Sequence, residues 1–210
     1  MELAITQSKE TQSQISPIHA VELLKEGNSR FVSQKFINRD FKEQIQQTST
    51  GQYPFASIVS CIDSRIPTEI VFDQGIGDLF NARIAGNFIN DDILGSLEFA
   101  CKLAGSKVIV IMGHTSCGAV KGACDDAKLG NLTQMLDKIK PAIDQIKTEE
   151  GEARNSSNIN FVNRVAVKNV ELTIDAVKRR SSVLNEMYEN GEIDIVGAMY
   201  DVGTGSVNFL

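Results

Sequence analysis

The sequence lacks several features that would assign it to other classes of protein. It contains no tryptophan, only two histidines and four prolines, and no apolar run approaches the roughly 20 residues that a membrane-spanning helix needs. It also lacks an excess of positive charge, because its net charge is −6 at pH 7. Nucleic acids and anionic membranes both bind basic surfaces, so we expect neither as a partner.

The N-terminus lacks the basic and then apolar segments of a signal peptide. We therefore expect a cytoplasmic protein whose four cysteines are reduced, because disulfides belong mainly to secreted proteins. Two of these cysteines, Cys101 and Cys124, lie in apolar helical patterns, which predict a packing role.

Apolar runs alternate with stretches of helical periodicity along the chain. Its 210 residues, 42% hydrophobic and 23% charged, fit one domain over residues 1–210. We expect an α/β fold with a mostly parallel β-sheet of about four to five strands flanked by helices, and an antiparallel C-terminal finish. The predicted strands cover residues 55–60, 79–85, 107–112 and 193–199.

Two helical regions have boundaries that the sequence suggests. Residues 1–15 are polar and predict a loose arm, after which Ser16 and Pro17 supply a capping hydroxyl and a proline that begin an N-terminal helix. Further along, an apolar stripe predicts a single long helix from the segment after Ser157 to near Asn190.

Reactive side chains gather where two predicted strands end. Cys61 follows the strand over 55–60, and His114 and Cys117 follow the strand over 107–112. Because ligands of open α/β sheets bind at the carboxyl ends of the strands, we expect these side chains to meet. Two thiols and an imidazole suit zinc. The sequence therefore predicts a zinc site with a fourth position for water or a carboxylate.

Asp63 is the carboxylate that stands closest in sequence to this site. Two thiolates and a neutral imidazole cancel the charge of Zn²⁺, so a bound water is less acidic than on a three-histidine zinc, where its pKa is about 7. Ligation by Asp63 would close the site, whereas a bidentate pair with Arg65 would hold the carboxylate off the metal. The residues alone leave open a closed structural site, an open catalytic site and a simple ion pair that fixes a loop.

The motifs at 61–65 (Cys-x-Asp-x-Arg) and 114–118 (His-x-x-Cys-Gly) closely resemble those of the β-class carbonic anhydrases. The resemblance covers roughly residues 18–210. It implies that zinc-bound hydroxide attacks carbon dioxide, that bicarbonate leaves, and that Asp63 and Arg65 form a catalytic dyad. Asp63 would be the fourth zinc ligand only in a closed state. The supporting stretches are residues 77–80, 83–87 and 95–100.

The resemblance also implies substrate-binding residues. Gln52 stands where some members carry a glutamine that donates to a substrate oxygen, and Gly118 belongs to the second motif. Phe80, Ala85 and Phe99 match an apolar pocket that in this family is completed across a dimer interface, although Phe99 replaces a common tyrosine. We therefore expect a homodimer or homotetramer that binds carbon dioxide and bicarbonate. Without the resemblance, Gln52 is a surface turn residue, and Phe80, Ala85 and Phe99 are core residues.

Two alternative functions fit the same residues. One is hydrolysis of carbon disulfide or carbonyl sulfide at the same site, and the other is a non-catalytic relative that holds zinc structurally or senses bicarbonate. The absence of tryptophan counts against regulation by bicarbonate, because that branch of the family uses a tryptophan in its anion pocket. His19 is the only other histidine and is no evident proton shuttle, so the proton leaves through buffer, Asp63 or a water chain.

Overall fold

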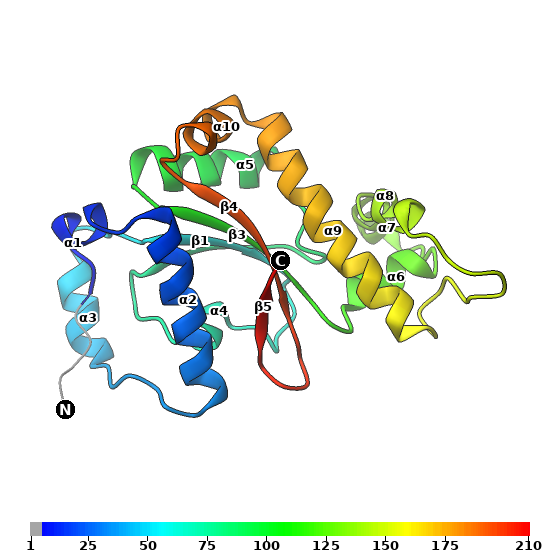
Figure 1. Ribbon diagram of the computed structural model, residues 1–210, viewed down its shortest axis with the longest axis horizontal. Coiled ribbons are helices and arrows are strands. Elements are labelled where there is room, and N and C mark those ends of the chain that lie inside the picture. The colour runs from blue at the N-terminus through cyan, green and yellow to red at the C-terminus, as the bar shows by residue number, and fades with distance from the viewer. Residues whose placement is uncertain (1–5) are drawn as a thin grey trace.

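A five-stranded sheet forms the centre of the computed structural model, which describes residues 6–210 (Figure 1). Its strand order is β2-β1-β3-β4-β5, with the first four strands parallel and β5 antiparallel to β4. The predicted α/β fold with a mostly parallel sheet is confirmed. The strands are β1 (Ala56–Ser60), β2 (Leu79–Arg83), β3 (Val108–His114), β4 (Asp194–Tyr200) and β5 (Val207–Phe209).

Helices cover both faces of the sheet. Helices α5 (Asp91–Glu98), α9 (Ile159–Arg180) and α10 (Ser182–Glu189) lie on one face, and α2 (Pro17–Val32) and α4 (Thr68–Val71) lie on the other (Figure 1). None of the described helices combines the length and apolarity needed to cross a membrane. The remaining elements are α1 (Lys9–Ser13), α3 (Phe41–Thr48), a π-helical segment η1 (Phe99–Leu103), α6 (Gly118–Cys124), α7 (Gly130–Asp137) and α8 (Lys140–Gln145).

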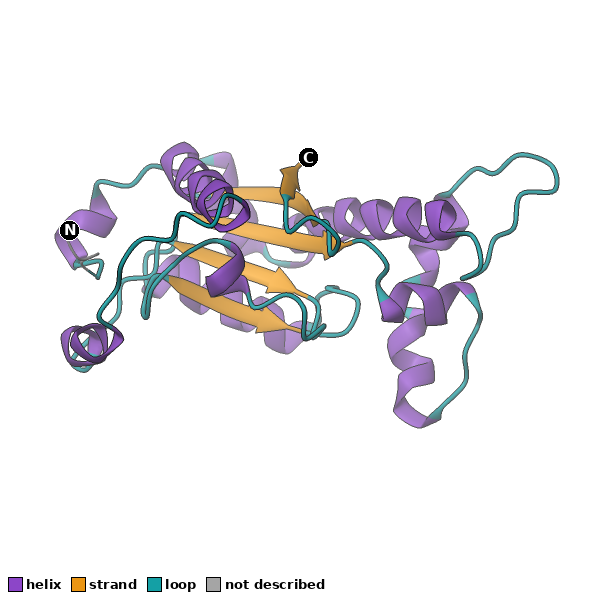
Figure 2. Cartoon of the chain, turned by 90° about the horizontal axis from the view of Figure 1, so that it is seen from below, coloured by secondary structure: helices purple, strands orange, loops and turns teal. Residues whose placement is uncertain are grey.

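The parallel strands point toward a separate group of helices. Figure 2 shows their arrowheads directed at α6, α7 and α8, which lie beyond the carboxyl edge of the sheet. In open α/β sheets this edge is where ligands bind. The helices beyond it therefore form one wall of any site at the strand ends.

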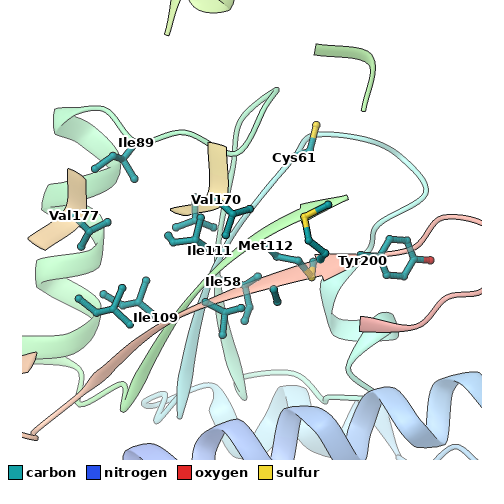
Figure 3. Packing of buried hydrophobic residues seen from close by; sticks show 14 of the residues in the cluster. Ile58, Cys61, Ile89, Ile109, Ile111, Met112, Val170, Val177 and Tyr200 are labelled. Carbon is teal, nitrogen blue, oxygen red and sulfur yellow. The ribbon is translucent and has the colours of Figure 1, made fainter. Parts of the chain in front are cut away.

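The core lies between the sheet and its covering helices. Every residue of β1 and β3 is buried, as expected for parallel strands that are covered on both faces. Figure 3 shows Ile109 and Ile111 packed near Val170 and Val177 of α9, whereas Cys61 lies past the end of β1. This packing fixes the strand ends from which the site residues project.

The loose arm predicted over residues 1–15 is wrong for the part that the structure describes. Residues 1–5 lie outside the described residues, but α1 begins after Ser8, whose hydroxyl accepts a hydrogen bond from the backbone of Thr11. Buried Gln12 donates to the carbonyl oxygens of Pro54 at 2.8 Å and Ala104 at 2.9 Å. These bonds join segments distant in sequence, so the polar composition of the arm did not reveal them.

The single long helix predicted after Ser157 is two helices. Helix α9 ends at Arg180, and Ser181 adopts an extended backbone (φ −115°, ψ 105°) before α10 begins. The Ser181 hydroxyl accepts from the backbone of Leu184 at 3.1 Å, which caps α10, and donates to Glu98 at 2.6 Å. The bond to α5 fixes the break, and the continuous apolar stripe concealed it.

Gly27 lets α2 pack closely on the end of α4. A Cβ at Gly27 would lie 1.8 Å from the carbonyl oxygen of Phe72, so an alanine requires the backbone to move. We expect Gly27→Ala to lower the free energy of unfolding by about 1–3 kcal/mol, measured by urea denaturation. The control is Gly95→Ala on α5, where an added Cβ meets nothing within 4 Å and the same measurement should show no loss. Equal effects at the two glycines would contradict the close contact.

Candidate metal centre

Three buried side chains converge at the carboxyl edge of the sheet. Cys61 follows β1, His114 ends β3, and Cys117 is the N-cap residue of α6. Strands β1 and β3 are paired neighbours, so they deliver the Cys61 thiol and the His114 imidazole to the same edge. The two sulfur atoms and an imidazole nitrogen lie within 4.8 Å of one another. The structure therefore brings together the three residues that were predicted as zinc ligands.

The His114 imidazole is fully buried and held in one tautomer. Its Nδ1 lies 2.9 Å from the carbonyl oxygen of Thr115, and because a carbonyl only accepts, Nδ1 carries the hydrogen. The lone pair then resides on Nε2, which has no hydrogen-bond partner among the described residues. A buried polar atom without a partner costs free energy. A metal ion beside the two thiols would provide that partner.

A hydrogen bond couples the two thiols of the cluster. The hydrogen bond from the Cys117 thiol is the main cause that lowers the pKa of Cys61 to about 4. The same bond, followed by burial, raises the pKa of Cys117. The pair therefore loses its first proton easily and holds the second. A divalent cation that binds both sulfur atoms must displace this proton.

Backbone N–H groups support both sulfur atoms. The N–H of Gly86 lies 3.5 Å from the Cys61 sulfur. Cys117 stands at the N-terminus of α6, where free N–H groups favour a thiolate. Gly86 has a φ of +85°, and a Cβ there would lie 2.6 Å from the side chain of Ile139. Glycine is therefore the residue that fits this position beside Cys61.

Cys101 and Cys124 lie apart from the cluster as free thiols. Burial raises the pKa of Cys101 to about 12 and is the main cause that raises the pKa of Cys124 to about 11. Both side chains therefore stay neutral near pH 7 and pack as small apolar groups, as the sequence predicted.

Asp63 and Arg65 form a bidentate ion pair beside the cluster. Arg65 donates from Nε to Asp63 Oδ1 at 2.9 Å and from Nη2 to Oδ2 at 2.7 Å, and its backbone N–H donates to Oδ1 at 3.0 Å. The side-chain hydrogen bonds from Arg65 hold the pKa of Asp63 well below its usual range. Asp63 Oδ2 lies 4.0 Å from His114 Nε2. An ionised carboxylate therefore stands next to the cluster while both its oxygens are bonded to the guanidinium.

Arg83 is a site residue that the sequence reasoning missed. From the end of β2 it donates to the carbonyl oxygens of Cys61 at 2.9 Å and Asp63 at 2.6 Å. These bonds fix the backbone that carries one thiol and the carboxylate. The available signal was that Arg83 lies near the end of a third predicted strand, but an exposed arginine at a strand end has many ordinary uses.

The predicted substrate-binding residues do not all join the cluster within one chain. Gln52 is exposed and precedes β1, at the opposite end of that strand from Cys61, so roughly 17 Å of strand separates them. Phe80 and Phe99 meet edge to face with ring centroids 6.2 Å apart. They line a cavity of about 630 Å³ whose described lining includes none of the three cluster residues.

Two further predicted residues do adjoin the cluster in sequence. Ala85 is half-buried and directly precedes Gly86, which contacts the Cys61 sulfur. Gly118 is exposed at the first position of α6, next to Cys117. Their roles in substrate binding stay predictions.

The donor set fits a borderline divalent cation. Two thiolates and one imidazole are common ligands of zinc, and the cluster provides both sulfurs and an unpartnered nitrogen. Three protein ligands leave a fourth position free in a tetrahedral site, which is the arrangement found in catalytic zinc centres.

Known proteins with similar sequences and structures agree on one family. The family model described as "Carbonic anhydrase" matches residues 56–207. Carbonic anhydrase 2 of Mycobacterium tuberculosis is 34% identical over 196 residues, which cover 90% of this chain and 91% of that protein. The β-carbonic anhydrase CafA of Aspergillus fumigatus has a TM-score of 0.69 and 27% identity, covering 91% of this chain and 88% of that one.

A further solved structure is one of two tetrameric β-carbonic anhydrases from Sordaria macrospora. It has a TM-score of 0.67 and 25% identity, covering 80% of this chain and 90% of that chain. The family match, the identity to the mycobacterial enzyme and the shared fold all extend over the strands that carry the cluster. The chain therefore belongs to the carbonic anhydrase family, and within that family to the β class.

Proposed function

We propose that this protein catalyses the reversible hydration of carbon dioxide to bicarbonate and a proton at a zinc ion held by Cys61, His114 and Cys117. The observation that supports this proposal is the convergence of three ligand atoms within 4.8 Å, one of them a buried nitrogen with no partner among the described residues. When bound, zinc supplies a Lewis acid that makes a water molecule nucleophilic near neutral pH.

Asp63 orients the reacting molecules in this proposal. Its Oδ1 accepts two hydrogen bonds from Arg65 and its Oδ2 accepts one, so Oδ2 keeps acceptor capacity. Oδ2 is also the oxygen that lies 4.0 Å from His114 Nε2. It can therefore accept a hydrogen bond from a water molecule or from the hydroxyl of bicarbonate. Because Arg65 binds both oxygens, it also holds Asp63 away from the fourth metal position.

A second copy of the chain completes the substrate pocket in this proposal. Gln52 lies a full strand length from Cys61 in its own chain, so it can serve only the cluster of another copy. The Phe80 and Phe99 pair likewise lines a cavity away from its own cluster. Tetrameric assembly is described for the Sordaria relatives. We propose a homodimer or homotetramer in which these residues face the metal centre of a partner.

Metal analysis tests the ligand set. We expect about one zinc per chain, and we expect Cys117→Ser to weaken zinc binding by more than about 100-fold, because even changes outside the ligand shell cost 10–100-fold. Wild-type affinity should fall as the pH is lowered, since Cys117 must lose its proton on binding. Cys124→Ser, which changes a thiol outside the cluster, should retain full zinc. Wild-type zinc affinity in Cys117→Ser would contradict the assignment.

Stopped-flow hydration assays test the role of Asp63. We expect Asp63→Asn to lower kcat/KM about 100-fold or more while zinc content stays unchanged, because the amide keeps the size but loses the charge and one acceptor. Asp175→Asn, at an exposed position of α9, makes the same chemical change away from the site and should leave the rate unaltered. Undiminished turnover of zinc-loaded Asp63→Asn would remove the dyad from the mechanism.

A glutamine variant tests completion of the pocket by a second copy. We expect Gln52→Ala to lower kcat/KM about three- to tenfold, the value of one lost hydrogen bond, with zinc content and oligomeric mass unchanged. Gln46→Ala, on an exposed position of α3, is the control. Light scattering should show a dimer or a tetramer. A fully active monomer, or equal rates for the wild type and Gln52→Ala, would refute the shared pocket.

A further inference from the structure

A second cavity lies near the metal centre, between α8 and α9. Its volume is about 430 Å³, and Phe88, Ile89 and Leu172 are among its apolar lining residues. Three cationic residues also line it, namely Lys138, Arg179 and Arg180. Among the described lining residues there is no carboxylate and no member of the metal cluster. The cavity is therefore separate from the metal centre and carries charge of one sign.

Two of the three cations have no acidic partner in the described part of the chain. Arg180 pairs with Asp91 at 2.6 Å, so its charge is compensated. Lys138 forms no ion pair with a described residue, and its Nζ lies 5.4 Å from the centre of the Phe88 ring. Arg179 forms no ion pair or hydrogen bond with any described residue. Lys138 and Arg179 therefore remain available for an anion.

The polar groups in the floor of the cavity already have partners. Buried Asn169 donates to the carbonyl oxygen of Gly86 at 2.8 Å, and buried Thr173 donates to the carbonyl oxygen of Asn169 at 2.7 Å. Gly86 in turn contacts the Cys61 sulfur, so the cavity floor is joined to the metal centre through one residue. Because these floor groups are occupied, the apolar walls, the rim cations and the exposed amide of Gln145 decide what binds.

Charge and wall chemistry together select one class of ligand. A small inorganic anion would satisfy the cations but leave the aromatic and aliphatic walls in contact with water. A neutral hydrocarbon would cover the walls and leave both cations unpaired. A carboxylate on an apolar body satisfies both, since charge-assisted hydrogen bonds to lysine and arginine are strong. The volume lies within the roughly 300–1,000 Å³ range of small-molecule sites.

We propose that this cavity binds an amphiphilic organic anion. Its carboxylate lies between Lys138 and Arg179, and its apolar body lies against Phe88, Ile89 and Leu172. This site goes beyond the proposed carbon dioxide chemistry and does not depend on it, because the cavity and the cluster share no lining residue.

Calorimetric titration of the zinc-loaded protein with octanoate tests the proposal. We expect one site per chain, and we expect the double variant Lys138→Gln/Arg179→Gln to bind octanoate about tenfold more weakly. The double variant Lys35→Gln/Lys42→Gln removes the same charge at exposed positions outside the cavity and should bind as the wild type does. Octanol lacks the carboxylate of octanoate, and acetate lacks its apolar chain. Both should bind at least about tenfold more weakly than octanoate.

Methyl NMR during the same titration locates the bound probe. Shifts of Ile89 and Leu172 would support the cavity. Shifts confined to Ile62, beside Cys61, would show octanoate on the metal and overturn the proposal. Equal affinities of the wild type and Lys138→Gln/Arg179→Gln for octanoate would also overturn it. Octanoate affinity that falls as the protein self-associates would also overturn it, because a second copy would then cover the cavity. These readouts do not use hydration activity, so failure here is distinct from failure of the proposed function.

Discussion

The parallel pairing of β1 with β3 is the constraint on which the site depends. Ser60 pairs with Met112, so Cys61, which directly follows β1, and His114, the last residue of β3, both stand at the carboxyl edge of the sheet. Cys61 and His114 can meet there only while this register holds, because a shift of one residue would turn alternate side chains to the other face. The buried aliphatic residues of both strands, and the helices packed on them, keep the register fixed.

Most residues around the cluster hold the predicted metal ligands in place and take no part in the chemistry. Arg83 holds the backbone of Cys61 and Asp63, Gly86 supports the Cys61 sulfur, and Thr115 fixes the tautomer of His114. Such partners outside the ligand shell orient a metal site and tune it. The Asp63–Arg65 pair differs because its carboxylate keeps acceptor capacity beside the cluster. In the proposed function, this ion pair keeps the fourth metal position open.

Sequence patterns predicted the fold and the cluster because both follow from the order of residues within short segments of the chain. Apolar runs identified four strands, and their ends placed Cys61, His114 and Cys117 together without any knowledge of contacts. Gln12 and Ser181 were misread because their deciding hydrogen bonds reach Pro54, Ala104 and Glu98, far away in the chain. Arg83 was missed for the same reason. The roles of Gln52 and Phe80 stay predictions, since they depend on a contact between copies that the order of residues within one chain does not encode.

X-ray absorption at the zinc edge of the loaded protein would identify the atoms bound to the metal. We expect two sulfur neighbours at about 2.3 Å, one imidazole nitrogen at about 2.0–2.1 Å and one further light atom. Cys61→Ser should lose one sulfur from this shell. A shell without two sulfurs and an imidazole, or one that Cys61→Ser leaves unchanged, would contradict the assignment of the strand-end cluster as the metal centre.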